Sequence, residues 1–304
     1  MRAAPMSRVL CVGHAVQDFV FRVPELPATA RKHQASAFAC VGGGPAATAA
    51  VAIARLGGEP LLAARLGDDA VAGLIEAELV GHGVDCAWLR RFPGCASSLS
   101  AVLLDAAGER MIVNYLDVRM QVAADWLPDP GALGCAAVLA DSRWPEGALA
   151  ALTAARAAGL PGVLDADRPV PAQRAVLAAA SHLAFSHEAL ADFTGETDPV
   201  RALGLVSRGL DAWCCVTVGA EGVHVLSRGE YRHLPGHRVT AVDTLGAGDV
   251  WHGAFALALA EGAENLDAVR FASAAAALKV QRGGGRAGAP TRAEVDDFMA
   301  SHPE

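Results

Sequence analysis

An acidic residue directly follows a glycine-containing turn late in the sequence, at Asp243-Thr244-Leu245-Gly246-Ala247-Gly248-Asp249. The apolar residues after Asp249 predict a helix, and the first N–H groups of a helix are unpaired and attract an anion. A carboxylate in that turn would repel a phosphate, but it suits a base that takes a proton from an attacking hydroxyl group. Helix capping by Asp249 is the alternative explanation.

The order of apolar runs predicts the elements that would position this turn. Short apolar runs alternate with alanine-rich helical stretches, which is typical of strands covered on both faces by crossover helices. We therefore expect an α/β fold with a mostly parallel central sheet flanked by helices. The predicted strands are 9–12, 61–66, 136–139, 162–164, 182–185 and 213–218; the predicted helices include 45–56 and 69–81, and three more follow Gly248.

Two segments interrupt this alternation. Residues 18–39 and 97–115 are rich in β-forming residues and are not followed by helices, and the second contains a predicted hairpin turn at Ala106-Ala107-Gly108. No repeat, low-complexity tail or linker divides the chain. We expect one domain over residues 1–304 in which these two segments form an inserted piece.

Composition excludes several classes of protein. The chain has 304 residues, 53% of them hydrophobic, and a net charge of −8, which argues against general nucleic-acid binding. The 7 cysteines form no C-x-x-C pair, which favours reduced thiols in the cytoplasm. The uncharged stretch 35–54 is interrupted by Gly42-Gly43-Gly44-Pro45. We interpret it as a strand, a turn and a buried helix, and we expect no membrane contact.

Two motifs resemble the signatures of the ribokinase-like (PfkB) family of carbohydrate kinases. The run from Asp243 to Asp249 is similar to the second signature, and Gly42-Gly43-Gly44-Pro45-Ala46-Ala47-Thr48-Ala49-Ala50, leading to Gly57, is similar to the first. The resemblance implies a ribokinase-like fold and a kinase that uses ATP and Mg²⁺. It also implies that segments 18–39 and 97–115 form a small β-sheet lid over the sugar site, through which two copies form a homodimer.

The resemblance also implies roles for the residues that match the motifs. Asp249 would be the catalytic base, and the amides of Gly246, Ala247 and Gly248 would hold the transferring phosphoryl group. Thr217, Gly219 and Gly222 match a nucleotide-binding T-x-G-x-x-G loop, and Gly285 and Gly288 would lie near the adenine or a closing loop. The alternatives are an ordinary β-turn for the first loop and a flexible surface loop for the second. The chain has no P-loop motif.

One departure concerns the metal. The family usually has Asn-x-x-Glu before a Thr-Gly pair, where it helps to organise Mg²⁺ and phosphates. Ser186 and Ala189 stand at these positions here, and Glu188 is shifted by one residue. We therefore assign Ser186 to the nucleotide site but name no protein ligand for Mg²⁺. The resemblance also allows a monovalent cation near Asp243, which some members of the family bind.

On the sugar side, Asp18 would accept hydrogens from two sugar hydroxyl groups, and Gly42, Gly43 and Gly44 would let the backbone approach the sugar. A solvated loop aspartate and a plain helix-entry turn are the alternatives. Lys32, Asn114 and Arg143 form a set of hydrogen-bond donors suited to an oxyanion on the substrate. Taken separately, each would be a surface charge or a satisfied polar group.

The sequences around these three residues resemble the 6-deoxy-6-sulfofructose kinases of the family, in which a Lys, an Asn and an Arg bind the sulfonate. The implied reaction transfers phosphate from ATP to 6-deoxy-6-sulfofructose and gives the 1-phosphate. The alternatives are a kinase for fructose, a phosphorylated ketose, ribose or a nucleoside, and a non-catalytic sugar or nucleotide sensor. A dehydrogenase is disfavoured because no Gly-x-Gly-x-x-Gly follows the first predicted strand.

Overall fold

The computed structural model describes residues 6–107, 109–120, 122–169 and 173–302. Within these residues nine strands form the main sheet, in the order β13-β12-β11-β10-β9-β8-β1-β4-β5, with only β12 and β13 antiparallel to their neighbours. The strands are β1 (Arg8–Gly13), β4 (Glu59–Gly67), β5 (Asp85–Phe92), β8 (Ala137–Asp141), β9 (Gly162–Ala166), β10 (His182–Ser186), β11 (Trp213–Thr217), β12 (Gly222–Ser227) and β13 (Glu230–Pro235). This confirms the predicted α/β class.

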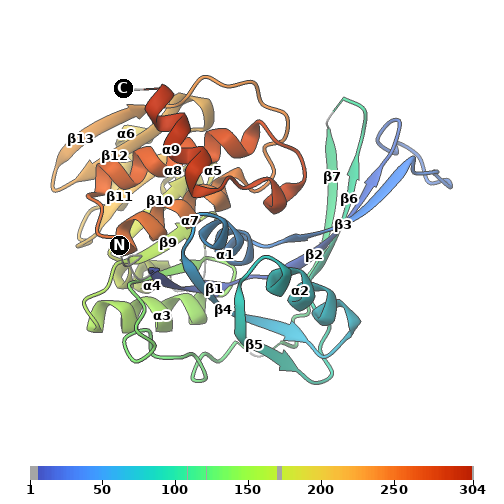
Figure 1. Cartoon of the computed structure of the whole chain (residues 1–304), viewed down its shortest axis with the longest axis horizontal. Coiled ribbons are helices and arrows are strands. Elements are labelled where there is room, and N and C mark those ends of the chain that lie inside the picture. Colours follow the sequence, from blue (N-terminus) through green and yellow to red (C-terminus); the bar gives the residue numbers. More distant parts are fainter. Residues whose placement is uncertain (1–5, 108, 121, 170–172, 303–304) are drawn as a thin grey trace.

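Helices cover both faces of this sheet (Figure 1). One face carries α1 (Pro45–Arg55), α2 (Ala70–Gly81), α7 (Ala247–Ala260), α8 (Asn265–Val280) and α9 (Arg292–Ser301). The other carries α3 (Pro145–Ala157), α4 (Gln173–Ala179), α5 (His187–Thr194) and α6 (Pro199–Val206). Strand β1 shows why two cores form: Val9 and Cys11 point into one core, and Leu10 and Val12 into the other.

A second sheet projects from the side of the main body (Figure 1). Its order is β3-β2-β6-β7, with β2 (Val16–Arg22), β3 (Ala37–Gly43), β6 (Leu99–Leu104) and β7 (Arg110–Tyr115). These strands come from the two segments that interrupt the predicted alternation, although β2 begins and β3 ends outside the expected range 18–39. Gly108 of the predicted hairpin turn lies outside the described residues. Val41, Asp18, Ser100 and Asn114 occupy one register across the four strands.

Helix α7 is held close to α1 by small residues. Gly44, with φ of 93°, is the N-cap of α1, and Pro45 begins the helix. A Cβ added at Gly253 of α7 would lie 2.6 Å from the backbone oxygen of Ala49 in α1. The two helices therefore approach more closely than any larger residue at 253 allows, and this contact fixes α7 on the body.

Some elements were not predicted from the sequence. Strand β5 alternates exposed and partly buried residues at the edge of the sheet, and the β12–β13 hairpin turns at Arg228 and Gly229, both with positive φ. Within the described ranges, the structure contains no helix that is both long and apolar enough to cross a bilayer.

Candidate active site

The N-terminus of α7 presents Asp249 in its first turn. Gly246, with φ of 75°, is the N-cap, and the helix has no side-chain cap, so capping by Asp249 is excluded. The N–H of Ala247 donates to the backbone oxygen of Thr244 at 3.2 Å, so this amide is already used within the turn. Gly248 and the half-buried Asp249 remain at the open end of the helix.

Several carboxylates surround Asp249. Burial raises its pKa to about 7, and the negative charges of Asp167, Asp141 and Asp18 add to this rise, while Arg143 opposes it. A carboxyl group with a pKa near neutral pH can accept a proton and release it again under ordinary conditions, which is the property that a general base requires.

Asp141, at the end of β8, connects three parts of the site. Its Oδ2 accepts the N–H groups of His14 (2.8 Å) and Ala46 (3.0 Å), and its Oδ1 accepts the N–H of Arg143 (2.8 Å). The bond to Ala46 supplies the cap that Gly44 cannot provide at the start of α1. The buried carboxylate thus fixes the β1–β2 loop, α1 and the turn that carries Arg143.

Arg143 is not a free cation. Its guanidinium donates to the carboxylate of Asp167, and the Ser142 hydroxyl donates to the same carboxylate. Behind this pair, Oδ2 of the buried Asp165 lies 3.5 Å from Nδ1 of His252 in α7. Burial raises the pKa of Asp165 and lowers that of His252 to about 4, so His252 is neutral at pH 7.

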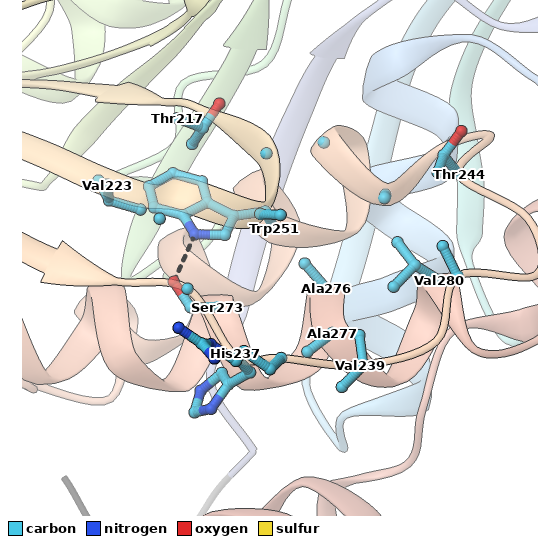
Figure 2. Close-up of a pocket in the computed structure, with 18 of the residues that line it drawn as sticks. Thr217, Val223, His237, Val239, Thr244, Trp251, Ser273, Ala276, Ala277 and Val280 are labelled. Atoms are coloured by element: carbon cyan, nitrogen blue, oxygen red, sulfur yellow. Dashed lines mark hydrogen bonds between the residues drawn. The ribbon is translucent and has the colours of Figure 1, made fainter.

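A cavity of about 710 Å³ opens beside the start of α7. Thr217, Gly219 and Gly222 of the predicted nucleotide loop line it, together with Ala247 and Gly248. Figure 2 shows the Trp251 indole beside Val223 on one side, and Ala276, Ala277, Val239 and Val280 on the other. Nε1 of Trp251 donates to Oγ of Ser273 at 3.2 Å, which fixes the indole. The lining side chains are mostly apolar, and Gly219, Gly222, Gly236 and Gly248 contribute backbone alone.

The other predicted nucleotide residues do not line this cavity, although Ser186 is paired with Thr217 on the neighbouring strand. Ser186 caps α5 by accepting the N–H of Ala189 at 3.2 Å. Gly285 lines a second cavity of about 490 Å³, and Gly288 packs against the backbone of Gly283.

The second cavity lies between the small sheet and the glycine turn. Its lining includes Val20, Ala39 and Val102 from the small sheet, and the residues Asp243–Leu245 and Gly283–Gly285 from the body. Nη2 of Arg110 in β7 donates to Oγ1 of Thr244 at 3.0 Å. The small sheet therefore contacts the turn that leads to Asp249.

The three predicted substrate glycines face groups of the protein itself. A Cβ at Gly42 would overlap the Arg286 guanidinium, one at Gly43 would lie 2.4 Å from Oδ2 of Asp18, and one at Gly44 would lie 2.4 Å from the backbone oxygen of His14. Arg286 is buried and pairs with Glu78 at 3.0 Å. Close packing of the protein is thus a sufficient reason for Gly42, Gly43 and Gly44.

The predicted anion-binding set is spread over three places. Asn114 donates to Oγ of Ser100 at 2.7 Å, and Ser100 is also hydrogen-bonded to Asp18, so Asn114 belongs to the Asp18 row. Arg143 lies on the body near Asp249. Lys32 is exposed on the connection between β2 and β3. No contact among these three residues occurs in the described part of the chain.

Several residues of the site were not foreseen from the sequence: Asp141, Asp165, Asp167, His252, Lys279 and Arg286. A signal existed for the first three, because each stands at the carboxyl end of an apolar run, and the carboxyl ends of parallel strands meet at one edge of a sheet. The other three depend on contacts between distant elements, and no local pattern marks them.

Comparisons with known proteins agree with this architecture. The structure of a "putative ribokinase" from Agrobacterium tumefaciens has a TM-score of 0.92 and 38% identity to this chain. The match covers 97% of this chain and 98% of the other. Arabidopsis thaliana ribokinase, solved with ribose and ATP, has a TM-score of 0.86 and 26% identity, covering 97% and 98%. A fructokinase from Vibrio alginolyticus is 29% identical over 323 residues, covering 97% and 99%.

These relatives are named ribokinase and fructokinase, which are sugar kinases for different sugars. The comparisons therefore show the class of sugar kinases but not the individual sugar, and they do not show the resemblance to sulfofructose kinases. The sequence model described as "pfkB family carbohydrate kinase" matches residues 6–292. The chain therefore belongs to the pfkB family of carbohydrate kinases, which transfer a phosphoryl group to an alcohol.

Proposed function

We propose that this kinase transfers the γ-phosphoryl group of ATP to the 1-hydroxyl of 6-deoxy-6-sulfofructose. The observation that carries the kinase reaction is the half-buried Asp249, with a pKa of about 7, in the first turn of a helix whose residues Ala247 and Gly248 line a 710 Å³ cavity. A base stands there next to an anion-binding helix end.

ATP suits the larger cavity. The adenine, a flat and mostly apolar ring, would lie between Trp251 with Val223 and the small side chains of α8, and the phosphates would point toward Thr244 and Gly248. When Mg²⁺ is bound with ATP, it neutralises the phosphate charge. The described residues include no group of three or more His, Cys, Asp or Glu side chains placed to hold a metal. We therefore expect Mg²⁺ to be held mainly by the nucleotide.

The proposed step is balanced. Asp249 accepts the proton of the sugar 1-hydroxyl group while the hydroxyl oxygen forms a bond to the γ-phosphorus of ATP. At the same time the bond between the γ-phosphorus and the oxygen that bridges to the β-phosphate breaks. The products are ADP and the sugar 1-phosphate, and the proton on Asp249 then passes to water. Asp18, on the inner face of the small sheet, would hold the sugar hydroxyl groups.

The anionic end of the substrate is proposed from the charge around Arg143. Besides Arg143, Arg65 and Arg168 lie close enough to His14 to help lower its pKa to about 4, with burial the larger cause. This edge of the sheet therefore carries three arginines beside the carboxylates of Asp141 and Asp167, and these arginines would favour a sulfonate. Asn114 would reach the same sugar from the Asp18 row, and Lys32 would join when the lid closes.

Fructose is the second candidate. Arg143 is already paired with Asp167, so its charge is partly neutralised before any substrate binds. A neutral ketose would need no additional cation at that position.

The test is ADP release with ATP and Mg²⁺ across six acceptors: 6-deoxy-6-sulfofructose, fructose 6-phosphate, tagatose 6-phosphate, fructose, ribose and adenosine. Selective turnover of the sulfonate supports the proposal. Preferred turnover of fructose assigns Lys32, Asn114 and Arg143 to structure. If the protein phosphorylates none of the six acceptors but still binds ATP in calorimetry, a non-catalytic sugar or nucleotide sensor is favoured.

We also propose that two copies pair through the outer face of the small sheet, where Phe38 is 56% exposed and contacts the rings of Phe19 and Phe21. Light scattering of the wild type and of Phe38→Asp tests this. A dimer that Phe38→Asp converts to a monomer supports the pairing, and a wild-type monomer contradicts it.

A further inference from the structure

A buried lysine lies directly behind the glycine turn. Lys279, in the last turn of α8, is 0% exposed. Its Nζ donates to the backbone oxygens of Asp243 (3.1 Å) and Arg282 (3.4 Å), and lies 3.6 Å from Oδ2 of Asp243. An ammonium group has three N–H donors, so three oxygen atoms match its capacity.

These oxygens belong to two loops that meet at the site. The carboxylate of Asp243 accepts the N–H of Leu245 at 2.9 Å through Oδ1, and the N–H of Gly285 at 3.4 Å through Oδ2. The backbone oxygen of Val280, next to Lys279, accepts the N–H groups of Val242 and Asp243. One lysine–aspartate pair thus joins the turn that leads into α7 to the glycine loop after α8.

The position of this pair matters for the reaction. Leu245 immediately precedes Gly246, the N-cap of α7, so the orientation of the Leu245 N–H affects how the helix presents Asp249. Both loops also line the second cavity. Another charged group close to this pair is Arg110, whose guanidinium contacts Thr244 from the small sheet.

A positive charge is required between these oxygens. Without it, a partly buried carboxylate and two carbonyl dipoles would face one another with no compensating charge, which is unfavourable in a medium of low polarity. Carbonyl and carboxylate oxygens in such a pocket are also the ligands that K⁺ accepts in proteins, and an ammonium group has the same charge. A covalently attached ammonium occupies this pocket permanently.

We propose that Lys279 is a positioning residue whose ammonium group serves as a built-in monovalent cation, fixing the turn Asp243–Gly246 and the loop Arg282–Gly285 for phosphoryl transfer without added K⁺ or NH₄⁺. This proposal rests on the proposed kinase function. Lys279 touches neither substrate nor nucleotide in it, and acts only through the two loops.

The experiment compares two variants in buffers of Na⁺, K⁺, NH₄⁺ or tetramethylammonium. Lys279→Met removes the charge and keeps most of the volume, whereas Lys279→Ala removes the charge and opens a space. A displaced loop costs on the order of 10²-fold in turnover, so we expect both variants to lose about that much in tetramethylammonium. We expect K⁺ or NH₄⁺ to restore activity in Lys279→Ala alone, and the wild type to respond to no cation.

Arg270→Met is the matched control, because it removes a cation from an earlier turn of the same helix, where Arg270 pairs with Asp267. It should keep wild-type turnover in every buffer. Three results would overturn the proposal: a wild type that K⁺ stimulates severalfold, full activity of Lys279→Met, or a folded Lys279→Ala that no cation restores. If neither variant folds, the wild type alone tests the proposal: stimulation by K⁺ or NH₄⁺ contradicts it, and equal activity in all four buffers supports it.

A second readout separates this proposal from the kinase function. Thermal unfolding of Lys279→Ala should shift to higher temperature with K⁺ but not with tetramethylammonium, while the wild type shows no difference between the two. This pattern in a protein that phosphorylates none of the tested acceptors would retain the cation role and reject the proposed function. Equal shifts in both proteins would reject the cation role even if the kinase reaction is found.

Discussion

The main body and the small sheet hold their polar residues differently. On the body, Asp141 accepts three backbone N–H groups and Arg143 is clamped by Asp167, so these side chains have one position before any ligand arrives. On the small sheet, every residue of β7 is exposed, and the sheet reaches the glycine turn through the bond between Arg110 and Thr244.

This difference separates two tasks. The body carries a rigid arrangement around Asp249, which suits a chemical step that requires fixed geometry. The small sheet carries Asp18 and Asn114 outside the main sheet, and its strand β7 is exposed along its whole length, which suits the recognition of a substrate that must enter and leave. Variants of Asp249 on the body should therefore lower turnover, whereas variants on the small sheet should mainly change the apparent affinity for sugar, and Arg143 is the body residue for which we expect a change in affinity.

The largest effect is expected for Asp249→Asn. Loss of the base should lower kcat by about 10²–10⁴-fold, because general base catalysis contributes this much. Nucleotide affinity should be kept or slightly increased, since a neutral amide removes the repulsion between the Asp249 carboxylate and the phosphates. Steady-state kinetics and calorimetry with ADP measure the two quantities, with Asp296→Asn on the exposed face of α9 as the control. Near-normal turnover would remove Asp249 as the base.

The pH dependence should follow from the same residue. A carboxyl group whose pKa is raised to about 7 keeps its proton below that pH, and a protonated group cannot act as a base. We therefore expect kcat/KM to fall about tenfold per unit below pH 7 and to level off above it. A pH profile of the wild type measures this. An acid limb near pH 4 would show that Asp249 titrates as an ordinary aspartate in the active enzyme.

Much of the fold followed from the sequence, because strands buried on both faces are continuous apolar runs. Strands β1, β4 and β8–β11 have that pattern, whereas β5 lies at an edge, carries charged residues and was missed. The glycine turn and Asp249 were found because their residue types and spacing are local. The lysine–aspartate pair could not be found this way, because it joins residues 36 positions apart.

Arg143→Ala tests whether the body, through Arg143, also binds the anionic end of the substrate. Charge-assisted hydrogen bonds contribute about 1.5–3 kcal/mol, so the apparent KM for 6-deoxy-6-sulfofructose should rise roughly 10–100-fold. Fructose is the control substrate and should change little. Because Arg143 lowers the pKa of Asp249, the acid limb of the pH profile should also move upward. Unchanged affinity for the sulfonate would remove Arg143 from the anion site.

The rigidity of the body can be tested at two glycines. Gly253→Ala places a methyl group against the backbone of Ala49 and should destabilise the protein by about 1–3 kcal/mol. Gly73→Ala in α2, where the added Cβ meets nothing within 4 Å, should instead stabilise it by about 0.5–1 kcal/mol. Urea unfolding measures both. If Gly253→Ala and Gly73→Ala changed the free energy of unfolding equally, α7 would be able to move away from α1 without a loss of stability.

The smallest effect is expected at the junction between the two regions. Arg110→Ala removes one exposed hydrogen bond to Thr244, and such a bond contributes about 0.5–1.5 kcal/mol, so the apparent KM for sugar should rise about 2–10-fold with kcat nearly unchanged. Arg232→Ala, on the exposed strand β13, serves as the control. If Arg110→Ala lowered kcat as strongly as a body variant, the small sheet would help to hold the glycine turn during the chemical step, and the division of tasks between the two regions would be wrong.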